Sequence, residues 1–198
     1  MNLANKLTIF RIILVPIMVI IPFLGVQGEF LGIPMTYWLI NAVFIIASIT
    51  DKLDGYIARK RNEITTFGKF ADPLADKILV LSAMIMLVEM NKLPAWIPII
   101  VTAREFIVSG YRLIAVEKGG KVIAASIWGK LKTVTQMLAI ILAYLDINAF
   151  AACFTNGNLT GFSFGLNLTA TILMIISVVA TIFSGYDYLK NGKDLLKD

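Results

Sequence analysis

Six long apolar segments limit what this chain can fold into. A helix that crosses a lipid bilayer needs about 20 mostly apolar residues. The composition fits such helices, because 58% of the 198 residues are hydrophobic and only 16% are charged, against about 25% charged in soluble domains. The sequence predicts an all-α integral membrane protein with one domain over residues 1–198 and six transmembrane helices, at Thr8–Leu24, Tyr37–Ile57, Pro73–Glu89, Leu93–Val116, Ile123–Leu145 and Leu166–Leu189.

The basic residues predict the orientation of these helices. Six spans put both ends of the chain on one side, and each of the 18 Lys and Arg residues except Lys92 lies on or near that side. Cytoplasmic loops carry an excess of Lys and Arg. We therefore expect both termini in the cytoplasm, in a multi-pass protein of the cell (inner or plasma) membrane. Some of these basic residues can instead form a collar for anionic lipids.

The chain has no histidine and a single cysteine, Cys153. An intrachain disulfide is therefore excluded, and the ligands that zinc prefers are missing. Acid–base chemistry falls to carboxylates, lysines or tyrosines.

Two pairs of aspartates lie at the ends of apolar segments. Asp51 and Asp54 are three residues apart, and Asp72 and Asp76 are four apart, so each pair shares one face of a helix. If the chain reverses between them, the pairs converge at the cytoplasmic end of a helical hairpin. Four carboxylates in one pocket need cations to stay ionised. Two Mg²⁺ or Mn²⁺ ions, which prefer oxygen ligands, would meet that need.

The residues between the acids favour a phosphorylated ligand. Gly55 and Ala58 leave one side of the helix without bulk, so a flat ligand could approach the backbone closely. Arg59 adds positive charge beside the acids. Metal ions and arginine together suit a diphosphate, whose charge they neutralise.

The complete pattern, DxxDGxxAR followed by eight residues and GxxxDxxxD, runs from Asp51 to Asp76. It resembles the signature of the CDP-alcohol phosphatidyltransferases, with all eight fixed positions and every gap matching. The resemblance implies the six-span CDP-alcohol phosphotransferase fold, a homodimer, and two metal ions held by the four aspartates. It also implies a CDP-linked lipid as substrate, with its cytidine near Gly55 and Ala58.

The resemblance further implies a reaction. A free alcohol hydroxyl attacks the β-phosphorus of the CDP-lipid and CMP leaves, and Asp76 is similar to the residue assigned as general base. The opening segment NKLTIFRIILVP is similar to that of the same enzymes, and the resemblance places Asn5, Thr8 and Arg11 near the nucleotide. The residues expected to bind the CDP-lipid are Asn5, Thr8, Asp54, Gly55, Ala58, Arg59 and Gly68.

A second set of charged residues predicts the acceptor alcohol. It lies in the segments TAREFIVSGYR and WGKLKTVTQ and consists of Arg104, Glu105, Arg112, Lys130 and Lys132. Glu105 and Arg112 share a helix face, where the carboxylate can orient the arginine. This much positive charge, expected to face the aspartate hairpin, suits a phosphorylated alcohol. The segments resemble those of family members that use sn-glycerol 3-phosphate and give phosphatidylglycerol phosphate.

Three other functions make different demands on the sequence. A sister enzyme could use another phosphorylated alcohol, such as inositol phosphate. A divalent-cation transporter would spread acids through the depth of the membrane, whereas the four aspartates lie together at one end. A non-catalytic lipid-binding scaffold would not need all four. We expect CDP-diacylglycerol, sn-glycerol 3-phosphate and membrane lipids as partners, and no nucleic acid.

Overall fold

The computed structural model describes residues 2–60, 65–117, 127–155 and 157–191. For Ala4, Tyr56, Ala58, Arg59, Lys69, Val116, Glu117 and Asn191 it describes the backbone alone. Long helices dominate these ranges: α1 Leu3–Ile20, α2 Met35–Lys60, α3 Thr66–Glu89, α4 Trp96–Glu117, α5 Ile127–Leu145 and α7 Gly161–Asn191. Shorter elements are the 3₁₀ turn η1 Ile21–Leu24, helix α6 Ala152–Thr155, and the strands β1 Glu29–Phe30 and β2 Ile33–Pro34 of a small hairpin.

Each predicted span coincides with one of the long helices, although residues 123–126 of the fifth lie outside the described residues. The helical prediction is therefore confirmed. Within the described ranges, two segments have the length and apolar composition needed to cross a membrane, Asn5–Leu24 and Gly161–Lys190. The crossing of all six helices stays a prediction.

The start of α3 differs from the predicted span. The helix begins at Thr66, well before Pro73, because the side chain of Thr65 caps it by accepting a hydrogen bond from the Gly68 amide over 3.0 Å. A capping threonine satisfies one of the amides that the first turn leaves unpaired. The extra turns place Gly68 and Asp72 on the helix, ahead of the predicted span Pro73–Glu89.

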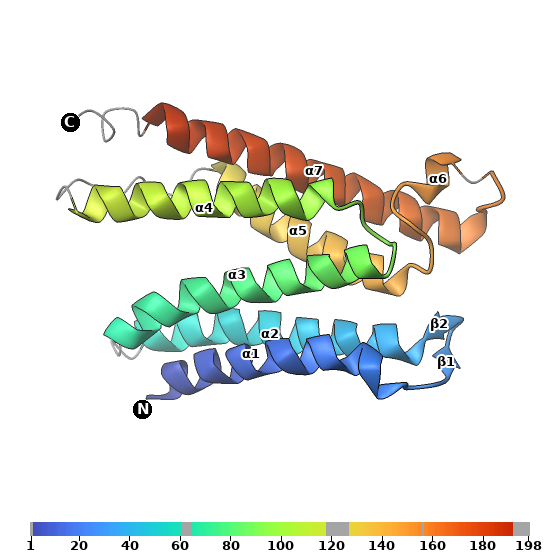
Figure 1. Cartoon of the computed structure of the whole chain (residues 1–198), viewed down its shortest axis with the longest axis horizontal. Helices are drawn as coiled ribbons and strands as arrows, with labels where there is room; N and C mark the ends of the chain where they lie inside the picture. Colours follow the sequence, from blue (N-terminus) through green and yellow to red (C-terminus); the bar gives the residue numbers. More distant parts are fainter. Residues whose placement is uncertain (1, 61–64, 118–126, 156, 192–198) are drawn as a thin grey trace. The chain divides into compact units, whose positions relative to one another are not determined.

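The chain divides into two compact units, and each is described by itself. One comprises Met1–Lys92 with Ala143–Ala149, and the other comprises Leu93–Leu142 with Phe150–Asp198. In the first unit, α1 packs against both α2 and α3, which run side by side in Figure 1. Its core includes the fully buried Met18, Phe44 and Leu79.

Within the first unit, two polar side chains bind the segment Ala143–Ala149 to the rest of the unit. The Tyr144 hydroxyl donates to the carbonyl of Ala83 over 2.8 Å. The buried Lys92 amine donates to the carbonyls of Ala143, over 3.3 Å, and of Asp146. The same amine lies 3.9 Å from the centre of the Tyr37 ring. Carbonyl oxygens at a helix C-terminus are favourable partners for a cation.

In the second unit, α4 packs against α7 (Figure 1). Polar residues of α7 support the turn that leads into α6, because Thr171 Oγ1 accepts from the Ala151 amide over 3.1 Å and Asn167 Oδ1 accepts from the Cys153 amide over 2.8 Å. Both side chains are buried and so satisfy backbone donors that would otherwise lack a partner.

Candidate active site

Three polar residues of α1 point into the first unit. Asn5, Thr8 and Arg11 recur every third residue and so share a helix face. All three are buried, and Arg11 is 0% exposed. A buried guanidinium is costly unless it is paired and hydrogen-bonded, so its partners determine the local structure.

The partners of Arg11 are the two aspartates of α2. Arg11 Nη1 lies 2.8 Å from Asp51 Oδ1, and Nη2 donates a hydrogen bond to Asp54 Oδ2. Asp54 is 2% exposed, while the Asp51 side chain keeps 30% of its surface exposed. One guanidinium therefore bridges both acids of this pair. Among the described residues its Nε is buried and has no hydrogen-bond acceptor.

The aspartates of α3 lie beside the same face of α1. Thr8 Oγ1 donates to Asp72 Oδ1 over 2.5 Å, and Asp54 lies within electrostatic range of Asp72 as well as of Asp51. Asp76 is half-buried one turn further along α3. The two acidic helices thus bring Asp54 and Asp72 within electrostatic range of each other, and the convergence of all four aspartates in one pocket stays a prediction.

These residues fit a divalent cation by their chemistry. In the part of the chain that the structure describes, no three acidic, histidine or cysteine side chains are grouped closely enough to hold a metal ion. The donors are nonetheless all carboxylates, the type that Mg²⁺ and Mn²⁺ prefer. A positive group already lies between Asp51 and Asp54, since Arg11 bridges them. Its single positive charge balances one of the carboxylates. The remaining negative charge can attract added cations.

Gly68 lets α1 approach α3 closely. A Cβ atom at this position would lie 3.2 Å from Thr65 Oγ1, 3.3 Å from Asn5 Oδ1 and 3.5 Å from Asp72 Oδ2. Thr65 Oγ1 donates to Asn5 Oδ1 over 2.8 Å. Of the residues expected to bind the CDP-lipid, Asn5, Thr8 and Gly68 therefore surround Asp72. Gly55 follows Asp54 on α2, and the side chains of Ala58 and Arg59 lie outside the described residues.

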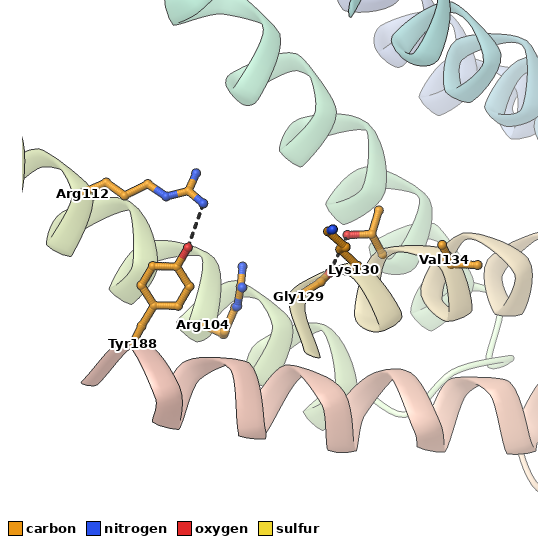
Figure 2. A pocket seen from close by; sticks show the side chains of 7 residues that line it. Arg104, Arg112, Gly129, Lys130, Val134 and Tyr188 are labelled. Carbon is orange, nitrogen blue, oxygen red and sulfur yellow. Dashed lines mark hydrogen bonds between the residues drawn. The ribbon is translucent and has the colours of Figure 1, made fainter. Parts of the chain in front are cut away.

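The second unit contains a basic cavity of about 520 Å³. Its lining is shared by three helices (Figure 2) and consists of Arg104 and Arg112 from α4, Gly129, Lys130, Thr133 and Val134 from α5, and Tyr188 from α7. Three of the five residues predicted for the acceptor phosphate, Arg104, Arg112 and Lys130, thus line one cavity.

The other two residues predicted for the acceptor phosphate, Glu105 and Lys132, do not line the cavity but interact with Arg104 or with each other. Glu105 Oε1 accepts from Arg104 Nη1 over 2.9 Å and also pairs with Lys132 Nζ. Lys132 is buried, whereas Lys130 is exposed. We expected Glu105 to orient Arg112; in the structure it pairs with Arg104 and Lys132, and the hydroxyl of Tyr188 accepts from Arg112 Nη2 over 2.9 Å.

Comparison with known proteins places these features in one family. The family model described as CDP-alcohol phosphatidyltransferase matches residues 1–183. The chain belongs to this family. The match includes the whole acidic pattern from Asp51 to Asp76, both arginines of the cavity, and α5.

Relatives of this phosphatidyltransferase that match nearly its whole chain are named as follows. A Bacillus subtilis (strain 168) protein named CDP-diacylglycerol--glycerol-3-phosphate 3-phosphatidyltransferase is 41% identical, over 99% of this chain and 97% of its own length. A Haemophilus influenzae protein of the same name is 37% identical, over 100% of this chain and 96% of its own. A Mycobacterium tuberculosis (strain H37Rv) protein named probable phosphatidylglycerophosphate synthase is 36% identical, over 95% and 80%.

Sequence reasoning missed two residues that contact the arginines of this phosphatidyltransferase's basic cavity: Tyr188, which lines the cavity, and Ser184, which does not. Ser184 and Tyr188 lie one turn apart on α7, and Ser184 Oγ accepts from Arg104 Nη2 over 2.5 Å. The available signal was a pair of polar residues on one face of an apolar helix, and the serine is 0% exposed. Gly129 and Gly185 make room for the same arginine, because a Cβ atom on either would lie within 3.6 Å of its side chain.

Proposed function

We propose that the protein transfers a phosphatidyl group from CDP-diacylglycerol to sn-glycerol 3-phosphate, giving phosphatidylglycerol phosphate and CMP. The observation that carries the proposal is the presence, in one family member, of an acidic cluster for metal and diphosphate and a basic cavity for a phosphate. The names of the full-length relatives support the same two substrates.

In this proposal the four aspartates hold two Mg²⁺ or Mn²⁺ ions. When bound, such ions polarise a diphosphate and stabilise the leaving nucleotide. Thr8 fixes the orientation of Asp72 through the hydrogen bond between them, and Arg11 keeps Asp51 and Asp54 on one side of α2.

Asp76 is the proposed general base. It takes the proton from the attacking hydroxyl of the acceptor, a new oxygen bond forms at the β-phosphorus, and the bond from that phosphorus to CMP breaks. A carboxylate within hydrogen-bond reach of the hydroxyl can perform this proton transfer. The CDP-lipid itself is assigned to Asn5, Thr8, Asp54, Gly55, Ala58, Arg59 and Gly68.

The acceptor phosphate is assigned to the basic cavity. Arg104, Arg112 and Lys130 line it, and a planar guanidinium can bind two phosphate oxygens at once. An uncharged alcohol would gain little from these three cations, so the cavity supports a phosphorylated acceptor. Glu105 and Lys132 are assigned to the support of Arg104.

The same proposal includes the membrane topology. All six long helices cross the cell membrane, both termini lie in the cytoplasm, and the acidic cluster faces the cytoplasm, as the distribution of Lys and Arg favours. The protein is proposed to act as a homodimer, with residues 1–198 as one functional domain.

The decisive experiment measures CMP release by the purified protein with CDP-diacylglycerol and Mg²⁺. Parallel reactions contain glycerol 3-phosphate, inositol phosphate or no acceptor. Release with glycerol 3-phosphate alone supports the proposal. Release with inositol phosphate alone keeps the mechanism and overturns the acceptor. If folded protein releases no CMP with any acceptor, the proposed reaction is wrong and divalent-cation transport becomes the reading to test.

A further inference from the structure

Tyr188 lies between the two arginines of the basic cavity. Its hydroxyl accepts from Arg112 Nη2 over 2.9 Å, as Figure 2 shows, and its ring centre lies 5.7 Å from the Cζ atoms of both Arg104 and Arg112. The tyrosine is 2% exposed. A side chain this buried has little freedom to move, so it can fix the positions of the groups that it contacts.

We propose that Tyr188 is a positioning residue for the acceptor phosphate, which holds Arg112 in the direction needed to bind that phosphate. The inference rests on the proposed function, because it assigns the cavity to a phosphorylated acceptor. It adds a residue from α7 to a site otherwise assigned to α4 and α5.

The two arginines differ in how they are held. Arg104 donates to Glu105 and to Ser184, on two sides of its guanidinium. Arg112 is an exposed residue, and within the described residues its hydrogen-bond partner is the Tyr188 hydroxyl. Without that bond, a long and exposed side chain would lose its fixed direction.

Arg112 also has the donors that a phosphate needs. A guanidinium has five N–H donors in a rigid plane, and a single one is used on Tyr188. The remaining donors can bind two oxygens of one phosphate. The ring of Tyr188 contributes a second effect, because its face attracts both cations and so offsets part of their mutual repulsion.

The test variant is Tyr188→Phe, which keeps the ring and removes the hydroxyl. We expect the KM for glycerol 3-phosphate to rise about tenfold, as for loss of a hydrogen bond to a charged group. The kcat at saturating acceptor and the KM for CDP-diacylglycerol should stay within about twofold of the wild type. The matched control is Tyr186→Phe, on the same helix but 60% exposed and outside the cavity, and we expect no change.

A double-mutant cycle separates positioning from a general effect on packing. If Tyr188 acts through Arg112, Tyr188→Phe should have little further effect on KM in an Arg112→Gln background, because the two residues share one interaction. Additive effects of the two substitutions on KM would overturn the proposal.

A binding measurement separates this proposal from the proposed reaction. Calorimetry with inorganic phosphate and with glycerol 3-phosphate, without CDP-diacylglycerol, should show affinity about tenfold weaker for Tyr188→Phe. If the wild type binds phosphate but releases no CMP, the reaction is wrong while Tyr188 is still tested by this loss of affinity. Equal phosphate affinity in folded wild type and Tyr188→Phe would overturn the role of Tyr188 whatever the reaction.

Discussion

Arg11 on α1 and Asp51 on α2 form an ion pair with 2.8 Å between Nη1 and Oδ1, and the same guanidinium binds Asp54. Asp72 of α3 is bound to the same helix through Thr8. The acidic cluster is therefore built from three helices, and α1 supplies the positive charge. This arrangement explains why the polar residues of α1 recur every third position in an otherwise apolar segment.

Replacing Arg11 should make the protein depend on divalent cations for its stability. In Arg11→Met the buried carboxylate of Asp54 loses its partner, and breaking a buried pair costs about 3–5 kcal/mol. We expect a lower apparent Tm in EDTA and a larger rise on adding Mg²⁺ than in the wild type. Lys6→Met, at an exposed position of the same helix, is the control. Equal responses to Mg²⁺ in all three proteins would contradict the assignment of these aspartates to a metal.

Asp76→Asn should stop the reaction while leaving the fold intact. The amide cannot accept the proton of the acceptor hydroxyl, so kcat for CMP release should fall by about 10²–10⁴. Glu89→Gln, at the exposed opposite end of α3, should retain activity. The rates of both variants are compared at saturating substrates, together with their apparent Tm. An active Asp76→Asn protein would exclude this residue as the base.

Gly68→Ala should reduce both stability and activity. The added Cβ would lie 3.2 Å from Thr65 Oγ1 and 3.3 Å from Asn5 Oδ1, closer than most side-chain contacts, so these two side chains must move and their hydrogen bond is disturbed. Overpacking of this kind costs about 1–3 kcal/mol. Gly110→Ala, in α4 with nothing within 4 Å of its Cβ, should instead stabilise by about 0.5–1 kcal/mol. Opposite shifts in Tm would confirm the prediction; two equal shifts would refute it.

Lys92 should make stability depend on pH in the alkaline range. It lies between α3 and α4, outside the proposed spans, and burial lowers its pKa from 10.5 to about 8, against the opposing effect of Asp146. Between these values the unfolded chain binds more protons than the folded one, so stability should rise with pH, by up to about 3 kcal/mol. The measurement is apparent Tm from pH 7 to about 10.5, in wild type and in Lys92→Met. The variant should lack this rise; an unchanged slope would show that another group titrates.

Long apolar runs and residue spacing explain which parts of the structure could be predicted from the sequence. Helices were predictable because long apolar runs have few alternatives, and the faces of the acidic pairs were predictable because spacing alone sets them. The start of α3 was not, since the cap depends on one threonine, Thr65, in a polar segment.

Partners across helices could not be predicted in the same way. Spacing puts Glu105 and Arg112 on one face, but the observed contacts of Glu105 with Arg104 and Lys132 depend on rotamers and on α5. Lys130 and Lys132 look equivalent in sequence, yet one lines the cavity and the other is buried against a glutamate. Tyr188 belongs to neither the acidic pattern nor the two basic segments.

The ion pair of Arg11 also limits the order in which the chain can be assembled during synthesis. The first helix leaves the ribosome with a cation whose partner Asp54 is 43 residues downstream. In the proposed topology, a lone arginine within a membrane helix is costly, so we expect α1 to reach its final position only after α2 has been made. In this topology we therefore expect a chain truncated before Asp51 to insert less stably than the full chain.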